Sequence, residues 1–239
     1  MGYDEAALVP VTERRLYLEY ENHFPVTKSL IYLNHAAVAP LCLPAAEAMK
    51  WLADDVLMNG SQHYVQWEEC YERFRESAAK LIGAHRDEIA IVKNTSEGIA
   101  TVALGMDWKP GDRVVAFREE FPANYFPWLR LESRGVEITW LSATDPLDRI
   151  EEAVRGAKLL AISYVQYLSG YRADIVSIGE ICKRHGCFFF LDAIQGLGVF
   201  PLDVNRAHID ALAADGHKWM FGPEGCGLLY VRKEWQDRI

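Results

Sequence analysis

The chain has 239 residues, half of them hydrophobic and a quarter charged, with a formal net charge of -9. A chain of this length and composition can bury a large core, which excludes disordered and fibrous proteins. It has no long basic run to match a phosphate backbone, so we expect no nucleic-acid partner.

The N-terminus is not expected to direct the chain to a membrane or to secretion. Met1-Gly-Tyr-Asp-Glu-Ala6 is acidic, precedes no apolar h-region and lacks the Ser or Thr that a myristoylation site needs at position 6. No segment approaches the roughly 20 apolar residues that cross a bilayer. The five cysteines lack paired metal-site spacing, which indicates reduced thiols and no metal. We therefore expect a cytoplasmic protein.

Residues 1–88 predict an irregular start through Pro44, then helices near 45–57 and 64–82. The second helix carries apolar or aromatic residues at positions 67, 71, 74, 78 and 81, a spacing that indicates a packed face. We expect residues 1–60 to form an N-terminal segment and residues 61–239 a larger domain, although no linker composition marks the boundary.

From residue 89 onward, short apolar runs alternate with helical stretches. Strands are predicted at 89–92, 113–117, 136–140, 159–162 and 187–191, and further buried runs at 209–214 and 228–231. Helices are predicted near 96–106, 122–134, 146–155 and 174–185. This alternation predicts an α/β fold, with a mostly parallel seven-stranded sheet and helices on both faces. Ligands of such sheets bind beyond the carboxyl ends of the strands.

Thr95 and Ser96 follow the first of these strands and open the next helix, with Gly98 close behind. Such residues allow an anion to approach the positive end of a helix, so a phosphate could bind here. The alternative is an ordinary helix N-cap.

Asp192 ends a strand of three phenylalanines and a leucine, and Lys218 lies between two apolar runs. The carboxylate needs a cationic or hydrogen-bonding partner, although a structural salt bridge or a helix cap would also explain it. We expect both residues to lie at neighbouring strand ends, on one side of the sheet. A lysine there loses proton affinity and becomes a nucleophilic amine.

A lysine, a carboxylate and a phosphate cup together meet the needs of pyridoxal phosphate, which takes Lys on its aldehyde and Asp on its ring nitrogen. A nucleotide-binding α/β protein is the weaker alternative. No Walker A loop is present, and Gln195-Gly-Leu-Gly198 lacks the third glycine of a dinucleotide site.

The motifs resemble the class V aminotransferase group of fold-type I pyridoxal phosphate enzymes, which includes cysteine desulfurases, selenocysteine lyases, kynureninases and isopenicillin N epimerase-like proteins. The resemblance runs from Tyr32-Leu-Asn-His-Ala-Ala37 to Tyr230-Val-Arg232 and is most specific at Asp192-x-x-Gln195, Gly216-His-Lys218 and Gly222-Pro-x-Gly225. It implies the large domain of that fold.

The resemblance also implies roles for the cofactor residues. Lys218 would bond the cofactor aldehyde, Asp192 would hold the ring nitrogen, and Gln195 would lie near the phenolic oxygen. The phosphate would lie against Thr95, Ser96, His217 and Asp215. Many relatives have Ser at the last of these positions, so the alternative role for Asp215 is to orient a neighbour.

Two positions depart from the desulfurase pattern. Phe121 stands where desulfurases carry a ring-stacking histidine, and a phenyl ring stacks without exchanging protons. Tyr167 stands where they often carry asparagine, which is closer to the epimerase-like branch. Asn34 and His35 match the loop on the substrate side, where His35 would either contact substrate or satisfy a turn.

Family members continue into a small C-terminal domain, which holds the arginine for the substrate carboxylate, and we expect that domain to be absent from this chain. No cysteine matches the sulfur-accepting position. The resemblance implies a homodimer acting on an amino acid by transamination, proton transfer at the α-carbon or β-elimination such as cysteine desulfuration. The alternative is a truncated or non-catalytic domain that binds pyridoxal phosphate.

Overall fold

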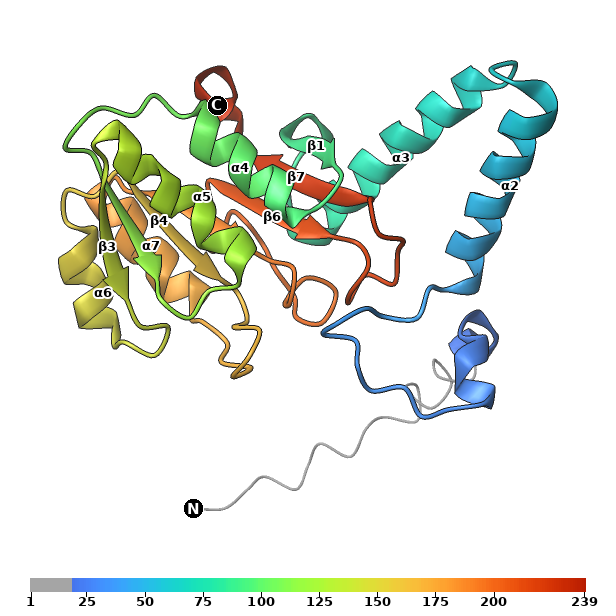
Figure 1. Cartoon of the computed structure of the whole chain (residues 1–239), viewed down its shortest axis with the longest axis horizontal. Coiled ribbons are helices and arrows are strands. Elements are labelled where there is room, and N and C mark those ends of the chain that lie inside the picture. The colour runs from blue at the N-terminus through green and yellow to red at the C-terminus, as the bar shows by residue number, and fades with distance from the viewer. Residues whose placement is uncertain (1–18) are drawn as a thin grey trace.

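A computed structural model describes residues 19–239 (Figure 1). The strands are β1 (Ile89–Val92), β2 (Arg113–Phe117), β3 (Glu137–Leu141), β4 (Leu159–Ser163), β5 (Phe188–Asp192), β6 (Ala211–Asp215) and β7 (Gly227–Val231). The α-helices are α2 (Leu43–Asn59), α3 (Tyr64–Ile82), α4 (Thr95–Gly105), α5 (Phe126–Leu129), α6 (Leu147–Val154) and α7 (Ile175–His185). Short 3-10 turns are η1 (Glu21–His23), η2 (Pro25–Lys28), η3 (Arg86–Glu88), η4 (Pro122–Asn124), η5 (Arg130–Arg134) and η6 (Lys233–Arg238).

The strands form one sheet in the order β1-β7-β6-β5-β4-β2-β3. The pairs from β6 through β3 are parallel, whereas β7 runs antiparallel to both β1 and β6. The predicted seven-stranded, mostly parallel sheet is therefore confirmed. Because β4 and β5 are parallel, their last residues, Ser163 and Asp192, lie side by side at one edge of the sheet.

Helices cover both faces of the sheet, as predicted (Figure 1). Side chains of a strand alternate between its faces, so Phe189 and Leu191 pack with α6 and α7, while Phe188 and Phe190 pack with α4. All four are fully buried. Both apolar layers hold the strand ends in place, which gives the loops beyond them a rigid base.

Glycine brings α4 unusually close to the sheet. A Cβ on Gly98 would stand only 2.7 Å from the Cβ of Ala213 on β6, closer than two carbon atoms can approach. The missing side chain therefore places the N-terminus of α4 directly beside the end of β6.

Helices α2 and α3 project away from the sheet (Figure 1), and α3 reaches the core only through its last turns, with Ala78, Ala79 and Ile82. The predicted stripe is therefore wrong in part, since Tyr71 and Leu81 are exposed. Tyr71 precedes the turns that reach the core, and Leu81 lies within those turns but on their exposed side. Part of the expected segment 1–60, including the acidic start Met1–Ala6, lies outside the described residues.

A buried carboxylate joins α2 to α3. Asp55 accepts hydrogen bonds from Asn59 (2.8 Å) and from the indole of Trp67 (3.1 Å), and Nδ1 of His63 lies 2.7 Å from it. These polar contacts fix the angle between the two helices.

The helix predicted over 122–134 is wrong as a single helix, because the segment divides into η4, α5 and η5. Pro122 and Pro127 lack the N–H that a helix interior requires, so each starts a new turn. Strands β3 and β5 each begin one residue later than predicted. Within residues 19–239, no helix combines the length and apolar character needed to cross a bilayer.

Candidate active site

A cavity of about 600 Å³ lies at the carboxyl ends of the strands. The loops that follow β1, β2, β4, β5 and β6 meet there, as expected for a parallel sheet. Its lining includes the predicted site residues Asn34, Thr95, Ser96, Phe121, Tyr167, Asp192, Gln195, Asp215, His217 and Lys218. The structure therefore brings together in one place residues that lie up to about 180 positions apart in the sequence.

Lys218 lies in the loop between β6 and β7 and is half-buried. Its loop is held from both sides, because Gly216 N donates to Cys226 O (3.0 Å) and Ala39 N donates to His217 O (2.8 Å). Burial lowers the pKa of the Lys218 amine, and the charges of Asp192 and Asp215 oppose that shift. The result is an amine with more of its neutral, nucleophilic form than an exposed lysine has.

Asp192 is 2% exposed, and its carboxylate accepts a hydrogen bond from Ile194 N at 3.1 Å. Burial raises the pKa of Asp192 to about 7; the nearby charge of Glu120 adds to this shift, and Lys218 opposes it. A carboxyl group of this kind can hold or share a proton near neutral pH.

The N-terminus of α4 forms an anion-binding surface in the cavity. The helix is capped by Asn94, whose Oδ1 accepts from Glu97 N at 2.9 Å, so Thr95 and Ser96 are not the cap but the first helical residues. Their backbone N–H groups have no partner within the helix. Thr95 Oγ1 is fully buried without a hydrogen bond, a cost that a bound anion would remove.

Asp215 and His217 form a pair beside this surface. Asp215 is 3% exposed, accepts from Gly216 N at 2.7 Å, and lies 2.9 Å from Nδ1 of His217. The carboxylate lies at ion-pair distance from the imidazole, although the geometry gives Nδ1 of His217 no hydrogen bond. This arrangement fits the alternative in which Asp215 orients a neighbour.

Phe121 and Tyr167 form an aromatic wall opposite the lysine. Their ring centroids are 5.3 Å apart at 80°, and Nζ of Lys218 lies 5.9 Å from the centre of the Phe121 ring. Gln166 fixes both loops, since its amide donates to Glu119 O (2.6 Å) and its carbonyl accepts from Leu168 N (2.9 Å).

Gln195 is held between two segments: its amide donates to Ala36 O and its carbonyl accepts from the Trp219 indole, both at 2.9 Å. His35 does not line the cavity. It stacks on Trp219, with centroids 5.3 Å apart, and faces a neighbouring apolar pocket of about 390 Å³. Of the two predicted substrate-side residues in this loop, only Asn34 lines the cavity.

Sequence reasoning missed Glu120, which is 7% exposed and whose charge reaches Asp192, and the serine that binds it, Ser163. Two consecutive glutamates after a strand are typical of a solvated loop, so only the pairing of β2 with β4 reveals the contact with Ser163. The sequence also gave no signal for Trp219 as the partner of Gln195.

The donors in this cavity fit the pyridoxal phosphate that the motifs imply. An unpartnered buried hydroxyl lies at a helix N-terminus, a proton-holding carboxyl lies at the end of β5, and an amine of lowered pKa lines the same cavity. These groups match a phosphate, a ring nitrogen and an aldehyde respectively.

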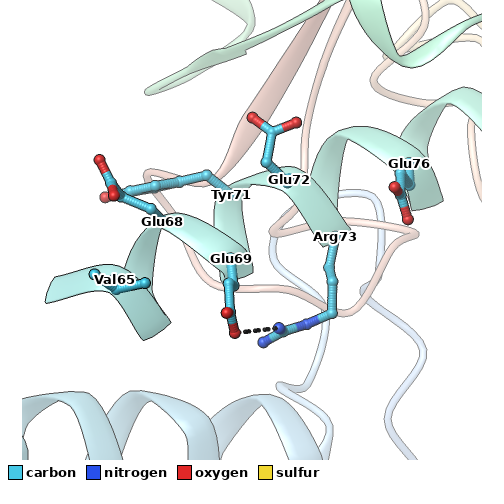
Figure 2. A pocket seen from close by; sticks show the side chains of 7 residues that line it. All are labelled: Val65, Glu68, Glu69, Tyr71, Glu72, Arg73 and Glu76. Atoms are coloured by element: carbon cyan, nitrogen blue, oxygen red, sulfur yellow. Dashed lines mark ion pairs between the residues drawn. The ribbon is translucent and has the colours of Figure 1, made fainter. Parts of the chain in front are cut away.

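A larger hollow of about 710 Å³ beside α3 offers no comparable chemistry. Figure 2 shows that all the side chains lining it come from that one helix, with Glu69 paired to Arg73 at 3.9 Å. It is an acidic helix surface that no second element encloses.

Comparison with known proteins gives three findings. A model of the family described as aminotransferase class-V matches residues 31–239. A probable cysteine desulfurase of Pyrococcus abyssi is 33% identical over 93% of this chain and 58% of its own length, and an uncharacterized aminotransferase of Bacillus subtilis, YcbU, is 32% identical over 92% and 60%. The apo structure of a cysteine desulfurase from Thermococcus onnurineus NA1 superposes with a TM-score of 0.83 at 31% identity, covering 92% of this chain and 58% of that one. The chain thus spans less than two thirds of the length of these relatives.

Proposed function

This chain belongs to the aminotransferase class V family, and on that premise we propose that it binds pyridoxal phosphate through Lys218 and acts on an amino acid. The family expected from the motifs is thereby confirmed. The observation that most supports the proposal is the meeting of Lys218, Asp192 and the unpartnered Thr95 hydroxyl in one cavity.

In this proposal each residue binds a different part of the cofactor. Thr95, Ser96 and the first turn of α4 hold the phosphate, and the His217 imidazole beside Asp215 contributes a further donor. Asp192 holds the ring nitrogen, and Phe121 packs against the ring face. The cofactor, when bound, supplies an aldehyde for the amine and a ring that accepts electrons.

The chain's own contribution to chemistry is proton transfer by Lys218. Its lowered pKa leaves part of the amine neutral, so it can take a proton from the α-carbon of an amino acid held above Asp192. Phe121 cannot exchange a proton, which leaves this role to the lysine. Transamination, epimerisation and β-elimination, including cysteine desulfuration, all begin with this step.

The test of this proposal is to load the chain with pyridoxal phosphate and follow exchange of the α-hydrogen of alanine and of cysteine into deuterium oxide. We expect exchange that Lys218→Ala abolishes. Binding without exchange would favour a chain that holds the cofactor and turns nothing over. A chain that binds a nucleotide and not pyridoxal phosphate would contradict the proposal.

We further propose a cytoplasmic homodimer, in which residues 1–60 form a segment separate from the domain of residues 61–239. In support, α2 leaves large apolar side chains exposed, including Met49, Trp51, Leu57 and Met58. Scattered exposed residues are normal, but a set this dense on one helix is typical of an interface. Sedimentation should give a dimer, and Met58→Glu with Leu57→Glu should give a monomer; a wild-type monomer would contradict the proposal.

A further inference from the structure

Glu120 is a buried acid with no assigned role. It lies in the loop after β2, next to Phe121, and is 7% exposed. Ser163 donates to both of its carboxylate oxygens, through its backbone N–H (2.7 Å) and through its hydroxyl. The buried amide of Asn124 lies beside the same carboxylate.

The partners of Glu120 are neutral, so they support a negative charge without cancelling it. Two donors on a carboxylate favour its ionised form, while burial favours the neutral one and raises the pKa of Glu120. An ionised Glu120 therefore acts on other buried groups through a medium that screens charge weakly.

Asp192 is such a group. Ser163, which binds Glu120, is the direct neighbour of Asp192 across the parallel strands β4 and β5. The charge of Glu120 raises the pKa of Asp192, second only to burial. The other charged groups near the pair are Glu119 on the same loop and Lys218 beyond β6.

We propose that Glu120 is a positioning residue for the cofactor: its carboxylate places a second negative charge behind Asp192, so that the site selects pyridoxal phosphate with a protonated ring nitrogen. This inference rests on the proposed function. One carboxylate beside the ring nitrogen can share a proton with it. A second negative charge nearby favours the state in which the proton stays on the nitrogen, so that the ring carries a full positive charge. The ring then withdraws electrons more strongly.

The test compares two cofactors in binding experiments at pH 8. One is pyridoxal phosphate, and the other is its carbocyclic analogue, in which a C–H group replaces the ring nitrogen. Glu120→Gln keeps the size of the side chain and an acceptor for Ser163 while removing the charge. We expect it to raise the Kd of pyridoxal phosphate about tenfold, equal to about one unit of proton affinity, and that of the analogue less than about twofold.

Two matched controls isolate the path of the effect. Glu119→Gln removes the same charge from the neighbouring exposed position and should leave both Kd values within about twofold. In an Asp192→Asn background, Glu120→Gln should no longer change the Kd of pyridoxal phosphate, because the residue that connects the two charges is gone.

Equal weakening of both cofactors would overturn the inference, because it would show that Glu120 only shapes the loop of Phe121. An unchanged Kd for pyridoxal phosphate would also overturn it. If the wild-type chain failed to bind either cofactor at Lys218, the proposed function would fail instead. Should Glu120→Gln not fold, carbon-13 NMR of the loaded wild-type protein decides: an ionised Glu120 carboxyl at pH 8 is expected, and a protonated one refutes the inference.

Discussion

Replacing Asp192 by Asn should make the cofactor-free protein more stable at neutral pH. The carboxyl is 2% exposed and its pKa is raised from 3.8 to about 7 by burial and by Glu120. In the unfolded chain the same group ionises near its ordinary pKa. Folding therefore opposes its ionisation, which costs free energy above that value. Asn keeps the shape of the side chain and carries no charge.

The size and sign of the effect follow from the two pKa values. Because the folded pKa is the higher one, the folded state binds more protons, so stability falls as pH rises from about 4 to about 7 and is constant beyond. The interval of about three pH units corresponds to about 4 kcal/mol at 1.36 kcal/mol per unit. Asp192→Asn removes this loss, so its free energy of unfolding at pH 8 should exceed that of the wild type by about 4 kcal/mol.

Urea unfolding of both proteins between pH 4.5 and pH 8 measures this difference. Other acids of raised pKa, such as the partly buried Asp210, contribute equally to both proteins and cancel. If the free energy of unfolding changed with pH in the same way for both proteins, the prediction would be wrong, because Asp192 would then ionise as easily in the folded chain as in the unfolded one. Pyridoxal phosphate should stabilise the wild type more than the variant, since only the wild type offers its ring nitrogen a charge.

Three further predictions concern helix α4 and the contact between α2 and α3. Gly98→Ala should lower the free energy of unfolding by about 1–3 kcal/mol, because its Cβ would meet that of Ala213 at 2.7 Å; urea denaturation measures this. Thr95→Val removes an unpartnered buried hydroxyl, so it should raise stability by about 1 kcal/mol while weakening pyridoxal phosphate in a binding titration. Asp55→Asn should speed amide hydrogen exchange at the turn between α2 and α3, where His63 approaches the charge at 2.7 Å. The pKa of Asp55 is lowered by these contacts, so their support is present at neutral pH and lost as pH falls through that pKa.

Thr101 provides the control for the two changes on α4, because it lies on the exposed face of the same helix. Thr101→Val should leave cofactor binding unchanged. A Gly98→Ala protein as stable as the wild type would mean that α4 does not press on β6. Tight cofactor binding by Thr95→Val would contradict the proposal that the phosphate lies against Thr95. Unchanged amide hydrogen exchange in Asp55→Asn would contradict the proposal that Asp55 holds α2 and α3 together.

The sheet and most of its site could be predicted because their signals are local. Buried parallel strands are continuous apolar runs, as at 187–191. A polar or charged residue at the carboxyl end of such a run lies at the same edge of the sheet as the residues that end the neighbouring strands. Asp192 and Lys218 were found in this way. The segment 122–134 does not form the expected single helix, because its two prolines lack the N–H groups that a helix interior requires, and this outweighs the apolar pattern.

Contacts that depend on register or on loop packing could not be predicted. Glu120 meets Ser163 only because β2 lies next to β4, an order that the sequence does not state. His35 packs on Trp219, which lies in a loop far away in the sequence, and spacing alone did not distinguish this from a position facing the cavity. On α3, Tyr71 is exposed because only the last turns of the helix meet the core, whereas Leu81 lies in those turns on the side away from it.

Borohydride reduction of the chain loaded with pyridoxal phosphate, followed by peptide mass mapping, tests the role of Lys218 directly, with Lys218→Ala as control. We expect a Schiff-base absorption band that the variant lacks and a reduced adduct at Lys218 alone. No band, or an adduct spread over exposed lysines such as Lys80 and Lys93, would contradict the assignment of this cavity as a pyridoxal phosphate site.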